Sequence, residues 1–122
     1  MSQSSNNKYN LEERTAKIGE NIIKFCQSVH NDQILSPLIS QLVRSGTSIG
    51  ANYMEANGAS SKKDFANKIF ICKKECQETK HWLRMISVCR PEEMSRIDLL
   101  SQEVKELTLI FQKITTTLRG NH

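Results

Sequence analysis

Apolar residues recur along four stretches of the chain at the spacings of three and four residues that mark one face of an α-helix. The first stretch follows Asn10, a capping residue with Glu13 three positions later, and closes at Asn31-Asp32. We therefore expect a first helix between these points. Its apolar face consists of Leu11, Thr15, Ile18, Ile22, Phe25 and Val29.

The second stretch opens at Ser36-Pro37, because serine caps helices and proline suits the first helical position. Gly58 supplies its end. We expect a second helix between them. Its apolar face consists of Leu38, Leu42, Ile49, Tyr53 and Ala56.

The third helix is expected from Ser61 to about Val88, and the fourth from Pro91-Glu92-Glu93 to Arg119-Gly120. The apolar face of the third consists of Phe65, Ile69, Cys72, Cys76, Thr79, Leu83 and Ile86, and that of the fourth of Ile97, Leu100, Val104, Leu107, Phe111, Ile114 and Leu118. All the connections are short, so neighbouring helices should be antiparallel. The pattern predicts an all-α fold, an antiparallel up-down-up-down four-helix bundle. It covers residues 10–119, with a flexible polar tail at 1–9 and a short C-terminal tail at 120–122.

Small residues crowd the middle of the second helix, in "SGTSIGA" at 45–51. A phosphate-binding loop would need a lysine after its glycines and a preceding strand, and neither is present. Glycine costs about 1 kcal/mol relative to alanine inside a helix. Gly46 and Gly50 therefore indicate the close approach of a neighbouring helix or of another subunit.

Candidate catalytic and metal-binding residues are sparse. Glu75, Glu78 and His81 contain a Glu-x-x-His pair, but a di-iron bundle needs a second such pair and two more glutamates. The three histidines are scattered and define no nucleophile–base arrangement. We expect no enzymatic activity, no metal and no cofactor. Glu75, Glu78, Asn52 and Arg44 suit instead a polar network at a helix–helix or subunit interface.

The cysteines and the chain's N-terminal residues bear on location. The polar sequence MSQSSNNKYN lacks the apolar core of a signal peptide, and no apolar run is long enough to cross a membrane. We therefore expect a cytoplasmic protein without membrane association. In a reducing compartment Cys26, Cys72, Cys76 and Cys89 are expected to be buried free thiols.

Positive charge is concentrated in the third helix. Residues 61–90 hold eight basic and three acidic residues, a net +5, whereas the whole chain carries +4. Such a stripe can follow the phosphates of RNA or DNA, and the alternative is a solvated helix face. Trp82 on this helix turns toward Glu75 and Glu78, where its indole N–H favours an interface partner. The candidate nucleic-acid-binding residues are Lys62, Lys63, Lys73, Lys74, Lys80 and Arg84.

Two segments, "QLVRSGTSIGANYMEA" at 41–56 and "SKKDFANKIFICKKECQETKHWL" at 61–83, resemble the signature of a bacterial four-helix-bundle family. This is the 23S rRNA-intervening-sequence protein family, related to the accessory variability proteins of diversity-generating retroelements. Gly50 and Ala56 depart mildly from the pattern. The positions that match the motif are Arg44, Ser48, Asn52, Glu55, Glu75, Glu78 and Trp82.

The resemblance implies a non-catalytic bundle that assembles as a ring-like homopentamer. In the retroelement branch it implies a basic pentamer that binds nucleic acid and a reverse transcriptase. In the other branch it implies a reading frame within an rRNA insertion. The rival to a nucleic-acid-binding protein is a protein–protein scaffold whose charge only aids solubility.

Overall fold

The computed structural model of the chain describes residues 10–120, and the expected tail at 1–9 and residues 121–122 lie outside them. In the described part, four long α-helices follow one another, and a short 3₁₀ turn precedes the last. Gly120, expected to begin the C-terminal tail, is the last residue of the final helix. The elements are α2 (Leu11–Ser28), α3 (Leu35–Asn57), α4 (Lys62–Cys89), η2 (Pro91–Glu93) and α5 (Met94–Gly120).

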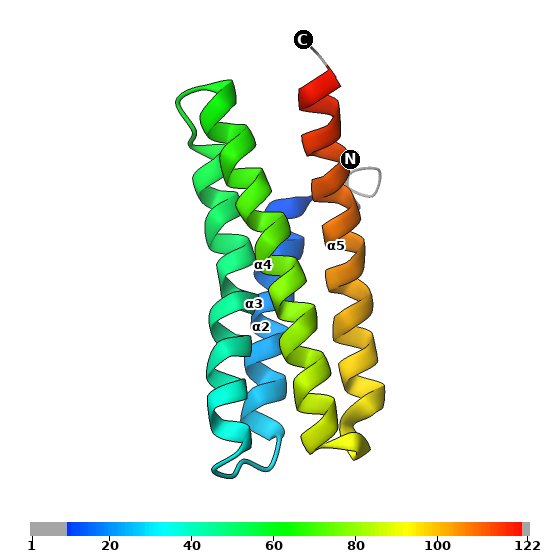
Figure 1. The fold of residues 1–122 in the computed structure, drawn as a ribbon. Helices are drawn as coiled ribbons and strands as arrows, with labels where there is room; N and C mark the ends of the chain where they lie inside the picture. The colour runs from blue at the N-terminus through cyan, green and yellow to red at the C-terminus, as the bar shows by residue number, and fades with distance from the viewer. Residues whose placement is uncertain (1–9, 121–122) are drawn as a thin grey trace, which may run out of the picture.

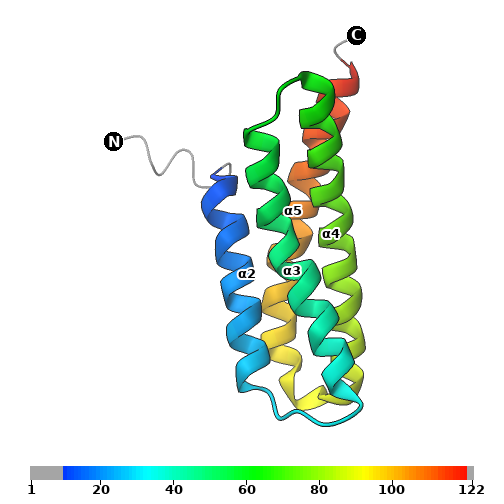
Figure 2. The ribbon, with the colours of Figure 1, turned by 90° about the vertical axis from the view of Figure 1, so that its left-hand side faces the viewer.

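The helices form an antiparallel up-down-up-down bundle, as predicted (Figure 1). Each helix packs against the next one in the chain, and the view from the side shows the short connections at the two ends (Figure 2). The smallest of the four interfaces lies between α2 and α5. There Arg14 donates to both carboxylate oxygens of Glu103, at 3.0 and 2.6 Å, and the Arg96 guanidinium lies 4.9 Å from the centre of the Phe25 ring.

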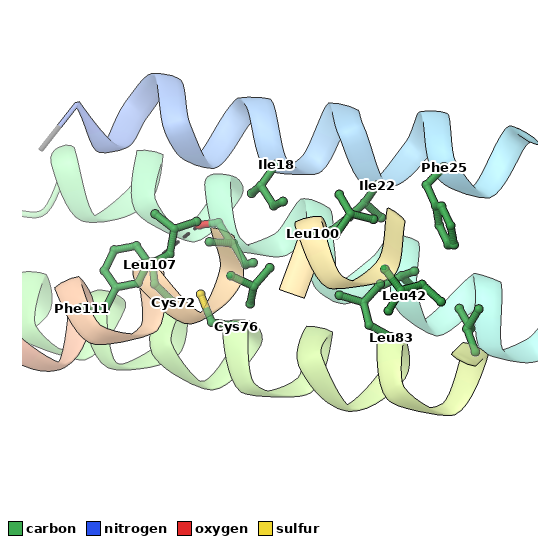
Figure 3. Packing of buried hydrophobic residues seen from close by; sticks show 14 of the residues in the cluster. Ile18, Ile22, Phe25, Leu42, Cys72, Cys76, Leu83, Leu100, Leu107 and Phe111 are labelled. Atoms are coloured by element: carbon green, nitrogen blue, oxygen red, sulfur yellow. Dashed lines mark hydrogen bonds between the residues drawn. The ribbon is translucent and has the colours of Figure 1, made fainter. Parts of the chain in front are cut away.

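Side chains from all four helices fill the interior (Figure 3). Ile22, Leu42, Leu83 and Leu107 are completely inaccessible to solvent. Nearly every residue of the four expected apolar faces is buried, which confirms the helical period read from the sequence. The exceptions are half-buried and mostly lie toward the helix ends: Leu38, Tyr53, Phe65, Ile114 and Leu118.

Two helix starts differ from expectation. α3 begins at Leu35, before the expected cap at Ser36, because the Asp32 carboxylate accepts the backbone N–H groups of Ile34 and Leu35 at 3.0 and 2.9 Å. Pro37 still lies in the first turn, where a missing N–H costs nothing. At the fourth helix, Pro91 opens a 3₁₀ turn, and the α-helix itself starts at Met94.

The glycines of α3 lie where α2 crosses it closely. A β-carbon on Gly50 would be 3.2 Å from the backbone oxygen of Thr15, and one on Gly46 would be 2.6 Å from Cδ1 of Ile22. A β-carbon on Gly19 of α2 would in turn be 3.5 Å from the backbone oxygen of Gly46. The close approach expected from the small residues is therefore that of a helix of the same chain.

All four cysteines are free thiols, but only two are buried as expected. Burial raises the pKa of Cys72 and of Cys76 to about 12. Cys26 and Cys89 are half-buried, because both lie at the edge of the core and not on its central stripe. Within residues 10–120, no helix has the length and apolar character needed to cross a membrane.

Candidate nucleic-acid interface

Helix α4 presents acidic residues to one neighbour and basic residues to the other. On the side facing α3, Arg44 pairs with Glu75 at 3.3 Å and with Glu78, and its Nε donates to Gln41 at 3.2 Å. The Arg44 side chain remains 46% exposed. Exposed pairs of this kind contribute at most about 1 kcal/mol, so the cluster fixes position more than it stabilises the fold.

The other motif residues on the α3–α4 seam form separate local contacts. Glu55 pairs with Lys68 at 2.7 Å. The Asn52 amide donates to the backbone oxygen of Ser48 at 2.9 Å, within α3. Among the described residues, Asn52 thus does not join Arg44 in the polar network that the sequence predicted, and bonds Ser48 instead.

A buried polar pair joins the same two helices and was missed in the sequence. The hydroxyl oxygens of Ser45 and Thr79 lie 3.0 Å apart in the core, and Thr79 also bonds the backbone oxygen of Glu75 at 2.7 Å. Both residues occupy positions on an apolar face. Their place there, where larger apolar residues are usual, was the signal that could have identified them.

Trp82 lies on the acidic side of α4 and is half-buried. Its indole nitrogen is fully buried and has no hydrogen-bond partner in the part of the chain that the structure describes. The neighbouring His81 ring packs edge-on at 4.9 Å between centroids. The interface partner expected for this N–H is thus not supplied by residues 10–120.

On the side facing α5, the Lys73 ammonium donates to the Gln112 amide oxygen at 2.6 Å. This contact indicates which residues of the two antiparallel helices lie opposite each other. The helices are antiparallel, so counting seven residues forward from Lys73 along α4 and seven residues back from Gln112 along α5 brings Lys80 level with Lys105. Toward the other end, Arg119 lines the same hollow as Ala66, which lies one turn after Lys62.

Two cations of α5 therefore extend the basic stripe of α4, and the sequence analysis missed them because residues 91–122 carry no net positive charge. Neither these two α5 cations nor the four α4 cations beside them form an ion pair with a carboxylate of residues 10–120. Lys63 and Lys74 are exposed on the outer side of α4, a quarter turn away. We define the α4–α5 face as Lys62, Lys73, Lys80, Arg84, Lys105 and Arg119.

The α4–α5 face is long enough to follow a nucleic-acid backbone. From Lys62 to Arg84 the helix rises about 33 Å, at 1.5 Å per residue. This is about one turn of B-DNA, 34–36 Å. Since six cations lie along it, full engagement with duplex DNA would give a salt dependence with a slope of up to about 5 in log–log form.

No group of three histidine, cysteine or carboxylate side chains in the described range could hold a metal ion. Glu75 and Glu78, the acids considered as di-iron ligands, form ion pairs with Arg44. His81 is exposed and packs on Trp82. The site therefore offers charge and hydrogen-bond donors, and no set of metal ligands.

Another hollow of the described bundle is lined by acidic side chains and by no basic one. Between α2 and α3 a groove of about 400 Å³ has a floor of small residues such as Gly19 and Gly50, with Ile23 and Met54 at its edges. Both edge side chains are exposed, at 39% and 54%. No cation lines this groove, and its three carboxylates have no ion pair within residues 10–120. They are Glu12, Glu13 and Glu20.

Comparison with known proteins gives a protein family and a related solved structure. The 23S rRNA-intervening sequence protein family matches residues 7–113. Among solved structures, the chain is similar to a protein with unknown function from the S23 ribosomal protein family of Bacteroides thetaiotaomicron, with 28% identity and a TM-score of 0.79. The similarity covers 86% of this chain and 97% of that one. No curated protein matches the chain.

Proposed function

Because the chain belongs to the 23S rRNA-intervening sequence protein family, we propose that it is a non-enzymatic, homopentameric accessory protein that binds nucleic acid through its α4–α5 face. The observation that carries this proposal is the row of six cations contributed by two helices in register. A nucleic acid is a suitable ligand for such a row, because its phosphates repeat along the backbone as these cations repeat along the bundle.

The polarity of the bundle also supports this assignment. Acidic residues are gathered on the α3 side of α4 and around the α2–α3 groove, and the α4–α5 face holds cations without carboxylate partners. Fields of one sign over a surface raise the encounter rate with a polyanion. Repetition of the face around a pentamer would multiply that field and lengthen the surface that one strand could follow.

A charge-matched pair of variants tests the proposal. Lys80→Glu with Arg84→Glu reverses two exposed cations of the face and leaves Lys73 bound to Gln112. Lys17→Glu with Lys24→Glu makes the same change of charge on the exposed side of α2. We expect the first variant to lose at least tenfold in affinity for structured RNA and to flatten the salt dependence, and the second to lose much less. Equal losses would show a non-specific charge effect.

The assembly and its protein partner have separate tests. Light scattering should give a mass near five times the 13.9 kDa of one chain. The likeness to retroelement accessory proteins makes a reverse transcriptase the first protein partner to examine. An adjacent reverse transcriptase gene with a template repeat would support that branch, and a surrounding rRNA insertion would support the other.

The α2–α3 groove favours a second candidate function, a protein–protein scaffold. Its apolar floor and edges, with three carboxylates at the rim, suit a basic amphipathic helix laid into a groove. A partner that is retained after nuclease treatment and is lost on Met54→Glu would support the scaffold. Retention of nucleic acid without any protein partner would argue against it.

A further inference from the structure

A hollow opens at one end of the α4–α5 face. Its volume is about 260 Å³, below the 300–1,000 Å³ of pockets that enclose drug-sized ligands. It therefore suits one ring system and not a whole nucleotide cofactor. Three residues of α4 and three of α5 line it: Ala66, Asn67, Phe70, Thr115, Leu118 and Arg119.

Phe70 is the largest side chain in the wall of this hollow and is 44% exposed. It lies outside the apolar stripe of α4 and takes no part in the core. The Lys73 ammonium lies 5.6 Å from the ring centroid and is itself held by Gln112 at 2.6 Å. The cation held by Gln112 thus lies over one face of an exposed aromatic ring.

The remaining wall combines apolar and polar groups without a carboxylate. Ala66 and Leu118 give apolar surface, and the exposed Asn67 amide offers donors and an acceptor. The Thr115 hydroxyl already donates to the backbone oxygen of Gln112 at 2.9 Å. Arg119 adds a second cation. A flat ring next to two cations is the combination by which proteins hold single strands, since the ring stacks a base and the cations contact the adjoining phosphates.

We propose that this hollow binds one nucleobase of a single strand of RNA or DNA, stacked on Phe70, with Lys73 and Arg119 at the flanking phosphates. The proposal rests on the proposed function and adds a binding mode to it. Duplex bases are already stacked on one another and cannot enter, so the hollow gives the protein a preference for unpaired strands over duplex of the same sequence.

Fluorescence anisotropy with labelled twelve-nucleotide strands of RNA and of DNA, and with the matching duplexes, tests the proposal. Phe70→Ala should weaken single-strand binding about fivefold or more, from the loss of one base stack, and leave duplex binding within twofold. The salt dependence should stay the same, because no charge is removed. Phe70→Trp should retain the single-strand affinity, and Phe70→Leu, apolar but not flat, should not.

Val88→Ala is the matched control, because Val88 is a second exposed apolar residue of α4 and lies outside the hollow. Unchanged single-strand affinity in Phe70→Ala, or equal losses for single strand and duplex, would overturn the base-binding proposal. If Phe70→Ala does not weaken single-strand binding but Lys80→Glu with Arg84→Glu still abolishes it, the proposed function stands without the base-binding hollow. If neither change affects binding, both fail. Whichever of RNA and DNA loses more in Phe70→Ala is the strand that enters the hollow.

Discussion

The side chain of Ile22 on α2 occupies the space beside the Cα atom of Gly46 on α3, so that a β-carbon there would lie 2.6 Å from Cδ1 and 3.2 Å from Cγ2 of Ile22. Ile22 is completely buried and β-branched, so its side chain has little room to move. We expect Gly46→Leu to destabilise the fold by about 2–3 kcal/mol, the upper range for overpacking. Urea denaturation followed by circular dichroism measures this.

Gly19→Ala is the control on the same helix pair. A β-carbon there would lie 3.5 Å from the Gly46 oxygen, an ordinary contact. Alanine is the better helix former, so this variant should be neutral or more stable by up to about 1 kcal/mol. A loss comparable to that of Gly46→Leu would show that the whole seam rejects any side chain, and not only the site beside Ile22.

The Ser45–Thr79 hydrogen bond should show energetic coupling between α3 and α4. Thr79→Val leaves the Ser45 hydroxyl with only a 3.4 Å contact to the Leu42 oxygen, and should cost about 1–2 kcal/mol. With Ser45→Ala added, the loss should be smaller than the sum, with a coupling energy of about 1 kcal/mol. Thr47→Val removes a hydroxyl that bonds the backbone within α3 and serves as the reference. Additive losses would contradict the coupling.

The fold could be predicted because one repeating signal specifies it. Alternating spacings of three and four residues defined the faces that became buried, from Ile18 in α2 to Phe111 in α5. The residues at which helices begin and end could not be predicted from that spacing alone. Asp32 was assigned to the end of the first helix, yet its side chain caps the start of α3. A carboxylate between two helices can serve either, and only the loop geometry decides.

Acid should selectively weaken the turn at Asp32. The backbone N–H of Leu35 and the Arg90 guanidinium hold the pKa of Asp32 below its ordinary value of 3.8. Because the folded protein binds this proton less readily than the unfolded chain, the contribution of the carboxylate is present above pH 4 and is lost as the pH falls through the lowered pKa. The stability difference between wild type and Asp32→Asn should therefore shrink below pH 4.

Asp98→Asn, at an exposed position of α5, provides the comparison for this pH dependence. Thermal melts of the three proteins between pH 2.5 and pH 7 measure the effect. A difference between wild type and Asp32→Asn that stays constant over this range would contradict the assignment of the turn.

Lys105 tests whether α5 shares the basic face. It is level with Lys80 across the helix pair, so Lys105→Ala should reduce the slope of log affinity against log salt by about 1. Lys24→Ala, on α2, should leave the slope unchanged. Titrations at several salt concentrations decide between them. An unaltered slope in Lys105→Ala would confine the interface to α4.

The thiols should divide into two classes in the folded protein. Burial raises the pKa of Cys72 and Cys76 to about 12 and that of the half-buried Cys26 to about 11, so none of these three presents a thiolate near neutral pH. We expect at most two of the four thiols to react with Ellman's reagent in buffer, and all four in denaturant. Cys89→Ser should remove the faster reaction. Rapid labelling of Cys72 would indicate that the bundle opens readily.

The candidate site was less predictable than the fold. The stripe of α4 followed from spacing alone, but its continuation through Lys105 and Arg119 depends on which residues of α5 lie opposite, a register that the sequence does not encode locally. Phe70 was not identified as a site residue from the sequence for the same reason. A single aromatic outside the apolar stripe gains meaning only when Arg119, far along the chain, closes the hollow beside it.

Trp82 is the only tryptophan of the chain, and its indole lies at the α3–α4 seam against the ring of His81. The ultraviolet emission of the protein therefore comes essentially from one chromophore at one place. The side chain is only half-buried, so contact with another molecule there would change the surroundings of the indole and its emission wavelength. The molecule thus carries an intrinsic optical reporter for this seam, readable during unfolding, dilution or titration without any attached dye.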